Sequence, residues 1–571
     1  MRNPGRLFIL VAIAIVAVFF GSKALYQWGS ERGFDGQPAM SYEDSVDTLQ
    51  GLLEDVDWGE NFVSRVSTVS VETASLSDTL PEIGTFPLVV DVPAGGNVVA
   101  EIFVSTEKSG TGTDGWMAQA AEDFNAANNR LKNGKGAKIR IRKIASGTGY
   151  QFIASRKHQP DAYSPSNHLW VRMAESHGVA MRPIREKTVR NVAGIVMKTS
   201  VAEQLTQSYG TLSVPNIVNA VVQGNIATGY TNPYASSTGL NFLVTVLGTF
   251  ANGDESNMLS PEVVSAFESF QRGIPFVALT TLQMRDSVRR DGSLDAFVME
   301  YQTFVKTDEL RSGFEFIPFG LLHDNPLYAV GNPGPDKLEA LELFADFLER
   351  DKYRRLASDY GFNPSLDHEA PFEIPEGGTL VEAQRIWKEK KDAGRPIVAV
   401  FVSDVSGSMG GTRLSGLKRA LRDGSSFIEP TNSIGLVQFN DDVDVVLPIR
   451  PFELLHKSAF HAAVTRMEAG GGTAMYDGIA VALSLLVKEV EKQPDAKPLL
   501  FVLTDGKTNE GMSFSRMSRV ITGLRIPVYT IGFEADLDEL GRLSSLVEAA
   551  NLNAGEQDVR FKIGALLNSQ M

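Results

Sequence analysis

The loop that follows an apolar run in the last third of the chain constrains the fold most strongly. Residues 398–403 are long enough for a buried strand, and they lead directly to Asp404, Ser406 and Ser408. A carboxylate and two hydroxyls on alternate residues form a compact set of hard oxygen ligands, which a divalent cation such as Mg2+ prefers. Taken alone, the same loop is also compatible with an ordinary polar turn after a strand.

Two later segments complete this pattern. Thr473 follows a run of glycines, and Asp505 ends a second apolar run, residues 498–504. In open α/β sheets, ligands bind at the carboxyl ends of strands, where we expect these side chains to meet. The chain has no cysteine, and no histidine lies in these loops, so zinc and copper are disfavoured. Asp477 either supports the ligands from behind or is a helix N-terminal charge favoured by the dipole.

Together these segments resemble a von Willebrand factor A (VWA) domain with a metal-ion-dependent adhesion site. The resemblance covers residues 396–571, where predicted helices alternate with strands, and it implies a doubly wound, Rossmann-like α/β sheet. It also implies a bound Mg2+, or Mn2+ or Ca2+ in its place, and a protein partner whose Asp or Glu takes the open coordination position. The expected ligands, of which the last two bind directly or through water, are Asp404, Ser406, Ser408, Thr473 and Asp505.

The middle of the chain alternates short strands with polar loops. A strand at residues 98–104 and a basic strand at residues 138–143 each lead into a hydroxyl-rich loop, and residues 229–243 place a third such turn at the start of a helix. The exposed N–H groups and the positive dipole end of a helix start favour an anion. Ordinary caps and turns are the alternative interpretation.

The order of these segments resembles a two-lobed, type II extracytoplasmic solute-binding protein of the kind that serves ABC importers. Sulfate-, molybdate- and phosphate-type members carry similar turns, so the resemblance implies a small solute or an oxyanion as ligand. A fused domain can instead have lost its ligand and serve as a scaffold. The candidate ligand-binding residues are Ser105, Thr106, Ser146, Gly147, Thr148, Asn232, Ser236, Ser237 and Thr238.

The N-terminus carries a short hydrophobic segment behind two arginines. Residues 7–20 are apolar and uncharged, and Arg2 and Arg6 precede them. This pattern matches a secretory signal peptide. It also matches an uncleaved transmembrane helix that continues to Trp28, with Lys23 reaching the headgroups, and we favour this anchor. In both cases the arginines hold the N-terminus inside, so we expect a single-pass cell-membrane protein with the bulk of the chain extracytoplasmic.

These patterns predict a fixed order of parts along the chain. They are residues 1–28 as anchor or signal segment, 29–97 as a membrane-proximal segment with a weak helix near Tyr42 to Val56, 98–366 as the two-lobed domain, 367–395 as a linker helix and 396–571 as the VWA domain.

Charge and residue pattern also limit the function. The net charge of -15 argues against nucleic-acid binding. No nucleophile–base pattern accompanies the predicted metal site, so we expect a binding protein and not an enzyme. The expected function is a membrane-anchored extracytoplasmic binding protein. The alternatives are the substrate-binding receptor of an ABC-type importer and, third, a metal-dependent hydrolase.

Overall fold

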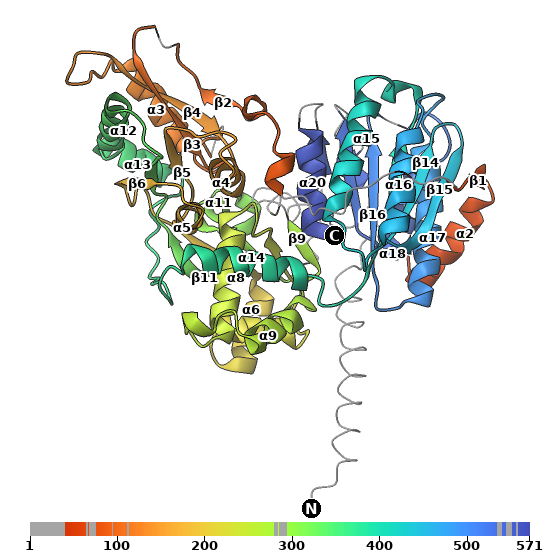
Figure 1. The fold of residues 1–571 in the computed structure, drawn as a ribbon. Coiled ribbons are helices and arrows are strands. Elements are labelled where there is room, and N and C mark those ends of the chain that lie inside the picture. The colour runs from red at the N-terminus through yellow and green to blue at the C-terminus, as the bar shows by residue number, and fades with distance from the viewer. Residues whose placement is uncertain are drawn as a thin grey trace, which may run out of the picture. The chain divides into compact units, whose positions relative to one another are not determined.

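The computed structural model describes residues 40–63, 67, 76–93, 95–110, 114–278, 284, 294–506, 508–533, 540–543, 551–554 and 558–571. The chain divides into two compact units (Figure 1). Unit 1 comprises the described residues of 40–82 and 394–571, and unit 2 comprises those of 83–289 and 294–393.

Unit 1 is built on one seven-stranded sheet. Its strands are β1 (Trp58–Glu60), β13 (Ile397–Asp404), β14 (Ser433–Phe439), β15 (Val443–Pro451), β16 (Lys497–Thr504), β17 (Val528–Phe533) and β18 (Asn551–Ala554). They lie in the order β1-β15-β14-β13-β16-β17-β18. The β14–β15 pair is antiparallel, and the other pairs of described strands are parallel.

Helices cover both faces of this sheet. One face carries α15 (Thr412–Gly424), α16 (Leu454–Arg466) and α20 (Val559–Gln570), and the other carries α2 (Tyr42–Leu53), α17 (Met475–Lys492) and α18 (Phe514–Leu524). Successive residues of β13 enter the two cores in turn: Phe401 packs on the first face and Val400 and Val402 on the second. A strand buried on both faces has no polar alternation, which explains its continuous apolar sequence. The doubly wound α/β prediction is confirmed.

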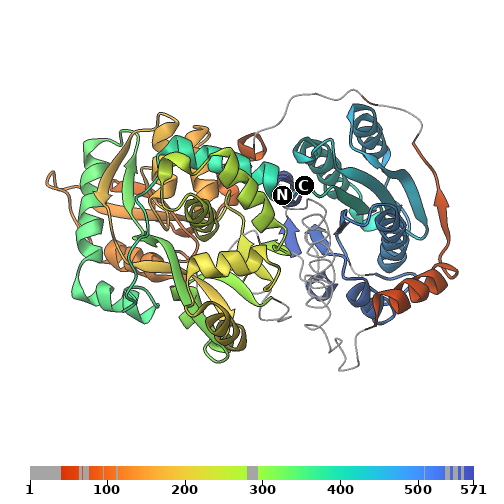
Figure 2. The same cartoon turned by 90° about the horizontal axis from the view of Figure 1, so that it is seen from below.

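The segment expected next to the membrane is divided between the two units. Helix α2 packs against α17 and α18, and Figure 2 shows it in red beside blue helices of unit 1. Strand β1 extends the sheet by pairing in parallel with Val443–Val445 of β15. Residues from Ile83 onward belong instead to unit 2. The described part of this segment is therefore packed within these two units.

Unit 2 contains two sheets, which are its two lobes. The six-stranded sheet runs β2 (Leu88–Val90), β4 (Ala137–Lys143), β3 (Val98–Val104), β5 (Ala162–Ser164), β12 (Leu327–Val330) and β6 (Met181–Arg185). The five-stranded sheet runs β11 (Phe314–His323), β7 (Asn191–Lys198), β10 (Ala296–Glu300), β8 (Thr228–Thr231) and β9 (Phe276–Ala278). The chain passes from the first sheet to the second after β6 and returns after β11, as the two-lobed prediction requires.

Helices of unit 2 pack around the two sheets. Their bounds are α3 (Trp116–Ala126), α4 (Ser146–Ala154), α5 (Leu169–Ser176), α6 (Thr199–Tyr209), α7 (Val214–Val222), α8 (Ser237–Phe250), α9 (Pro261–Gln271), α11 (Tyr301–Val305), α12 (Pro335–Leu348), α13 (Asp351–Asp359) and α14 (Gly377–Lys390).

The predicted linker helix is α14, and it is an integral part of unit 2. The Trp387 indole N–H donates to the Tyr230 hydroxyl (2.6 Å), and the Gln384 amide donates to the Pro233 carbonyl (2.8 Å). At its start, a Cβ on Gly377 would lie 2.1 Å from the carbonyl oxygen of Arg172 in α5. Helix α14 therefore contacts both lobes, and a free linker over residues 367–395 is not what the structure shows.

The predicted transmembrane helix lies within residues 1–39, outside the described part of the chain. Of the helices that the structure does describe, none combines the length and apolar character needed to cross a bilayer.

Candidate metal site and solute pocket

Oxygen-bearing side chains gather where β13 and β16 end, at one edge of the unit 1 sheet. Asp404, the last residue of β13, accepts hydrogen bonds from the Ser406 backbone N–H (2.7 Å) and from the Thr504 hydroxyl (2.5 Å). The hydroxyl oxygens of Ser406 and Ser408 lie 3.1 Å apart. Ser408 in turn donates to Oδ1 of Asp505 (2.8 Å). A chain of hydrogen bonds thus connects Asp404 with three of the other four predicted ligands.

Thr473, the remaining predicted ligand, belongs to a neighbouring glycine-rich loop. The Gly407 N–H donates to the Gly471 carbonyl (3.0 Å), which joins this loop to the loop after β13. Gly471 has a φ of +78°, and a Cβ there would lie 2.3 Å from a carboxylate oxygen of Asp441, so the turn requires glycine. The Thr473 N–H donates to Oδ1 of Asn509 (2.8 Å). Its hydroxyl has no hydrogen-bond partner among the described residues.

The electrostatics of this cluster favour a cation. Burial raises the pKa of Asp404, hydrogen bonds from Ser406 and Thr504 lower it, and the charge of Asp505 raises it. One cation of the protein is already present, because the Arg413 guanidinium lies 2.8 Å from Oδ2 of Asp505. Asp505 has a side chain only 1% exposed, whereas that of Arg413 is 39% exposed. A buried pair of carboxylates therefore has a partly exposed counter-ion at its rim.

The chemistry of the donor set fits a hard divalent ion. All the predicted ligands offer oxygen, and carboxylate and hydroxyl oxygens suit Mg2+ better than softer metals. Among the described residues there is no group of three or more His, Cys, Asp or Glu placed to hold a metal, so the two carboxylates would have to be completed by hydroxyls and water. Asp477 instead holds the loop after β16, because its Oδ1 accepts a hydrogen bond from the Met512 N–H (2.8 Å).

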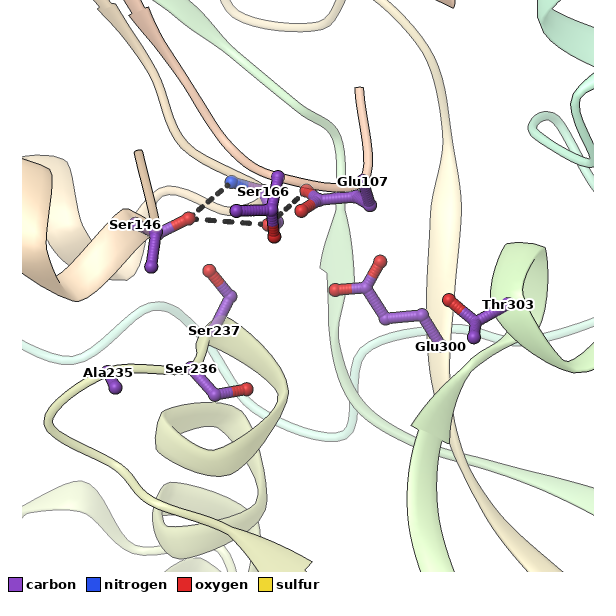
Figure 3. Close-up of a pocket in the computed structure, with 10 residues that line it drawn as sticks. Glu107, Ser146, Ser166, Ala235, Ser236, Ser237, Glu300 and Thr303 are labelled. Atoms are coloured by element: carbon purple, nitrogen blue, oxygen red, sulfur yellow. Dashed lines mark hydrogen bonds between the residues drawn. The ribbon is translucent and has the colours of Figure 1, made fainter. Parts of the chain in front are cut away.

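A second candidate site lies between the two lobes of unit 2. It is a pocket of about 30 Å3 (Figure 3). The six-stranded lobe contributes the loops after β3 and β5 and the start of α4, and the five-stranded lobe contributes the start of α8, the end of β10 and α11. Its lining residues are Thr106, Glu107, Ala145, Ser146, Ser166, Ala235, Ser236, Ser237, Glu300 and Thr303.

Glu107 lies in a buried network on the six-stranded side. Its Oε1 accepts from the hydroxyls of Ser105 and Ser166, each at 2.5 Å. Burial raises the pKa of Glu107, as does the charge of Glu300, while the neighbouring ammonium of Lys108 lowers it. Lys108 is itself fully buried, and burial lowers its pKa to about 8.

Glu300 lies across the pocket at the end of β10. Its carboxylate accepts from the Asn191 amide (2.7 Å), from the Thr238 hydroxyl (3.2 Å) and from Nδ1 of His323 (3.0 Å). The amide group of Asn241 lies 3.2 Å from Nε2 of His323. Asn241 is oriented by the Leu321 backbone, to which it donates at 2.8 Å and from which it accepts at 2.9 Å, so its NH2 group faces the imidazole. Nε2 is therefore placed to accept from this NH2 group, and Nδ1 to donate to Glu300.

The lobes are in direct contact beside this pocket. The Trp170 indole donates to the Ser237 hydroxyl (2.8 Å), and the Gly147 N–H donates to the Ala235 carbonyl (3.1 Å). A Cβ on Gly147 would lie 2.1 Å from the Tyr234 carbonyl oxygen, so only glycine allows this approach. The structure thus describes a closed arrangement of the two lobes.

The structure places the sequence-predicted solute residues in two groups. Thr106, Ser146, Ser236 and Ser237 line the pocket. The others lie behind or beside this lining and are Ser105, Gly147, Thr148, Asn232 and Thr238. Ser105 and Thr238 still act on the pocket, because they donate hydrogen bonds to Glu107 and Glu300 respectively.

The two acidic residues of the pocket are absent from the residues predicted from sequence. Glu107 stands inside the first hydroxyl-rich loop and Glu300 ends an apolar strand, β10. A carboxylate that ends a strand of apolar residues is the same signal that identified Asp404, and it was available at Glu300, whereas Glu107 stands three residues after the end of β3.

Two family models match the chain. Residues 109–363 match the bacterial extracellular solute-binding protein family, and residues 399–558 match the von Willebrand factor type A domain. Curated relatives include inter-alpha-trypsin inhibitor heavy chain H1 of Mesocricetus auratus, 30% identical over 148 residues, which are 24% of this chain and 16% of that one. Heavy chain H3 of Bos taurus is 30% identical over 159 residues, 25% of this chain and 18% of that one. The match spans less than a fifth of these relatives.

Solved structures are similar to each of the two matched regions of the chain. A periplasmic thiamin binding protein has a TM-score of 0.38 at 10% identity and covers 53% of this chain and 98% of its own. The sulfate-binding protein SubI from Mycobacterium tuberculosis H37Rv has a TM-score of 0.34 at 13% identity, with 51% and 97% covered. A von Willebrand factor type A protein from Catenulispora acidiphila has a TM-score of 0.28 at 20% identity, with 30% and 42% covered. On the two family matches, the chain joins a domain of the bacterial extracellular solute-binding family to a C-terminal VWA domain.

Proposed function

We propose that this chain is a membrane-anchored extracytoplasmic binding protein with two binding sites. Its VWA domain binds a protein partner through Mg2+, and its solute-binding domain binds or senses a small solute. The observation that carries the proposal is the connection of Asp404, Ser406, Ser408 and Asp505 by hydrogen bonds at one edge of the sheet.

In the VWA domain, each predicted ligand has a distinct supporting role. Thr504 and the Ser406 N–H keep the Asp404 carboxylate oriented and ionisable despite its burial. Ser408 holds Asp505, and Thr473 offers a hydroxyl without another partner among the described residues. A bound Mg2+ would supply an electrophilic position that the carboxylate of a partner's Asp or Glu can fill.

Binding is favoured over catalysis at this site. A metal hydrolase needs a positioned general base near the reacting water. The histidines nearest in sequence lie in α16 and have other partners: Nε2 of His456 lies 2.7 Å from the Ile434 carbonyl, and Nε2 of His461 lies 2.8 Å from the Ser425 hydroxyl. Neither is part of the Asp404 cluster.

The second candidate function, a receptor for an importer, is supported by the closed pocket between the lobes. Trp170 and Gly147 form hydrogen bonds between the two lobes. A solute that bridged the lobes would stabilise these contacts. The solute pocket has the same role in both candidate functions. The two functions differ in whether the VWA domain also binds a protein partner.

Isothermal titration of the full chain with MgCl2 tests the metal site. We expect one Mg2+ to bind wild-type protein, and we expect Asp404→Ala and Ser408→Ala to lose at least tenfold in affinity. Asp495→Asn is the matched control, because Asp495 is an exposed carboxylate of the same unit. Equal Mg2+ affinity in wild type and Asp404→Ala contradicts the proposal. Capture of a partner in Mg2+ but not in EDTA, lost in Ser408→Ala, tests the second half.

A further inference from the structure

Two carboxylates face the same small space in the solute pocket. Glu107 belongs to the six-stranded lobe and Glu300 to the five-stranded lobe, and Figure 3 shows the Glu300 carboxylate across the same space from that of Glu107, which is directed at Ser166. Glu107 is 9% exposed and Glu300 4%. Two like charges at close range in a buried site disfavour each other, and a positive group placed between them relieves that repulsion.

Lys108, beside the pocket, supplies one positive charge against these two carboxylates. All three donors of its ammonium are taken by protein acceptors, the Ser164 carbonyl (3.1 Å), the Ser164 hydroxyl (2.9 Å) and the Pro165 carbonyl (3.0 Å). Both ring nitrogens of His323 are also engaged, Nδ1 with Glu300 and Nε2 with Asn241. Among the described residues that line the pocket there is no Lys, Arg or His.

Two of the backbone N–H groups expected to bind an oxyanion are engaged within the protein. At the start of α4, the Gly147 N–H donates to the Ala235 carbonyl (3.1 Å). At the start of α8, the Gly239 N–H donates to the hydroxyl of its own N-cap, Ser236 (3.3 Å). The predicted preference of the residue 229–243 turn for an anion is therefore countered by internal capping and by the charge opposite it.

One carboxylate oxygen remains open to a ligand. Both hydrogen bonds of Glu107 reach Oε1, and Oε2 accepts none from the described residues. Glu300 already accepts three hydrogen bonds. A single open carboxylate oxygen, a second carboxylate and several hydroxyls suit the N–H donors of an ammonium group, whereas a metal such as Mg2+ requires about six oxygens in its shell.

We propose that the pocket binds a small solute through a protonated amine, which lies between Glu107 and Glu300. This inference rests on the proposed solute-binding function and names the class of solute. The cavity of about 30 Å3 has room for groups of one or two water molecules in size. The bound amine is therefore either a small molecule or the terminal amino group of a longer one, which enters the pocket while the lobes close around it.

Calorimetric titration of the full chain tests this proposal with probes of defined charge. The cationic probes are ammonium chloride, ethanolamine and 1,4-diaminobutane, the anionic probes are sodium sulfate and sodium acetate, and MgCl2 and CaCl2 are the metal probes. The Asp404→Ala background removes the predicted Mg2+ site of unit 1 from the metal titrations. The test variant is Glu107→Gln, which keeps size and removes charge. Glu315→Gln, an exposed position in β11 of the same unit, is the matched control.

We expect at least one amine to bind, with affinity reduced tenfold or more by Glu107→Gln and unchanged by Glu315→Gln. Stronger binding of sulfate or acetate than of any amine overturns the inference and leaves solute binding intact. Binding of MgCl2 or CaCl2 that Glu107→Gln abolishes also overturns it, in favour of a metal. If no probe of either charge binds, the solute-binding function fails as well. The wild-type titrations alone decide the sign of the preferred charge, whatever the stability of the variant.

Discussion

The docking of α2 onto the VWA domain gives the sharpest test of the domain boundary. Leu49 is 1% exposed and belongs to the same buried cluster as Val400 and Val402 of β13. Truncation of a buried leucine to alanine costs about 2–5 kcal/mol, as lost transfer free energy plus the cavity left behind. Because α2 packs against both α17 and α18, we expect about 3 kcal/mol for Leu49→Ala.

Hydrogen exchange followed by mass spectrometry measures this loss within the full chain. A loss of about 3 kcal/mol corresponds to roughly a hundredfold faster exchange of the protected amides of α2. Strand β3 of unit 2 provides an internal reference whose exchange should stay unchanged. Gln50→Ala is the matched control variant, since Gln50 is the exposed neighbour of Leu49 in the same helix. Exchange in α2 accelerated less than fivefold by Leu49→Ala refutes the argument that this helix belongs to the core.

Other predictions concern the two sites and the response to pH. Arg413→Met removes the guanidinium 2.8 Å from Asp505, so Mg2+ affinity measured by calorimetry should rise about threefold or more at low salt; a fall would show that Arg413 supports the ion. Gly147→Ala places a Cβ 2.1 Å from the Tyr234 carbonyl oxygen, so small-angle scattering should show lobes held apart and ligand binding should fall at least tenfold; unchanged closure contradicts the steric argument. Burial, then the charges of Lys457 and Arg422, lower the pKa of His461 to about 4. As pH falls below 6.5, the unfolded chain therefore binds a proton at His461 that the folded unit does not bind. Unit 1 loses stability as pH falls from 6.5 to 4. His461→Gln should reduce the difference in urea midpoint between pH 7 and pH 5. An equal difference in wild type and His461→Gln would show that His461 does not cause this pH dependence.

The metal-site candidates could be identified from sequence because their signal is local. Asp404 and Asp505 each close an apolar run, and parallel strands bring their carboxyl ends to one edge of a sheet. The hydrogen bonds that join Ser406 with Ser408, and Ser408 with Asp505, follow from that geometry. Mg2+ binding there and a membrane helix at the N-terminus stay predictions.

The solute pocket was only partly predictable. Hydroxyl-rich loops marked the correct region, and Ser146 and Ser237 do line the pocket. A loop sequence does not state which way a side chain faces, so Thr148 lies outside the lining. Glu107 and Glu300 were not among the predicted ligand-binding residues, because their meeting depends on two lobes that close from opposite sides.

Periodic and chain-local properties of this protein can be read directly from its residues: which segments form strands and helices, and which polar residues stand where strands end. The assignment of α2 and α14 to the cores came from folding in three dimensions, through contacts such as Ser45 against Gly523, where a Cβ would lie 1.9 Å from the serine oxygen. The charge of the solute pocket arose in the same way. Burial, shape and electrostatic coupling depend on which distant surfaces meet, and the linear pattern of residues does not show which surfaces these are.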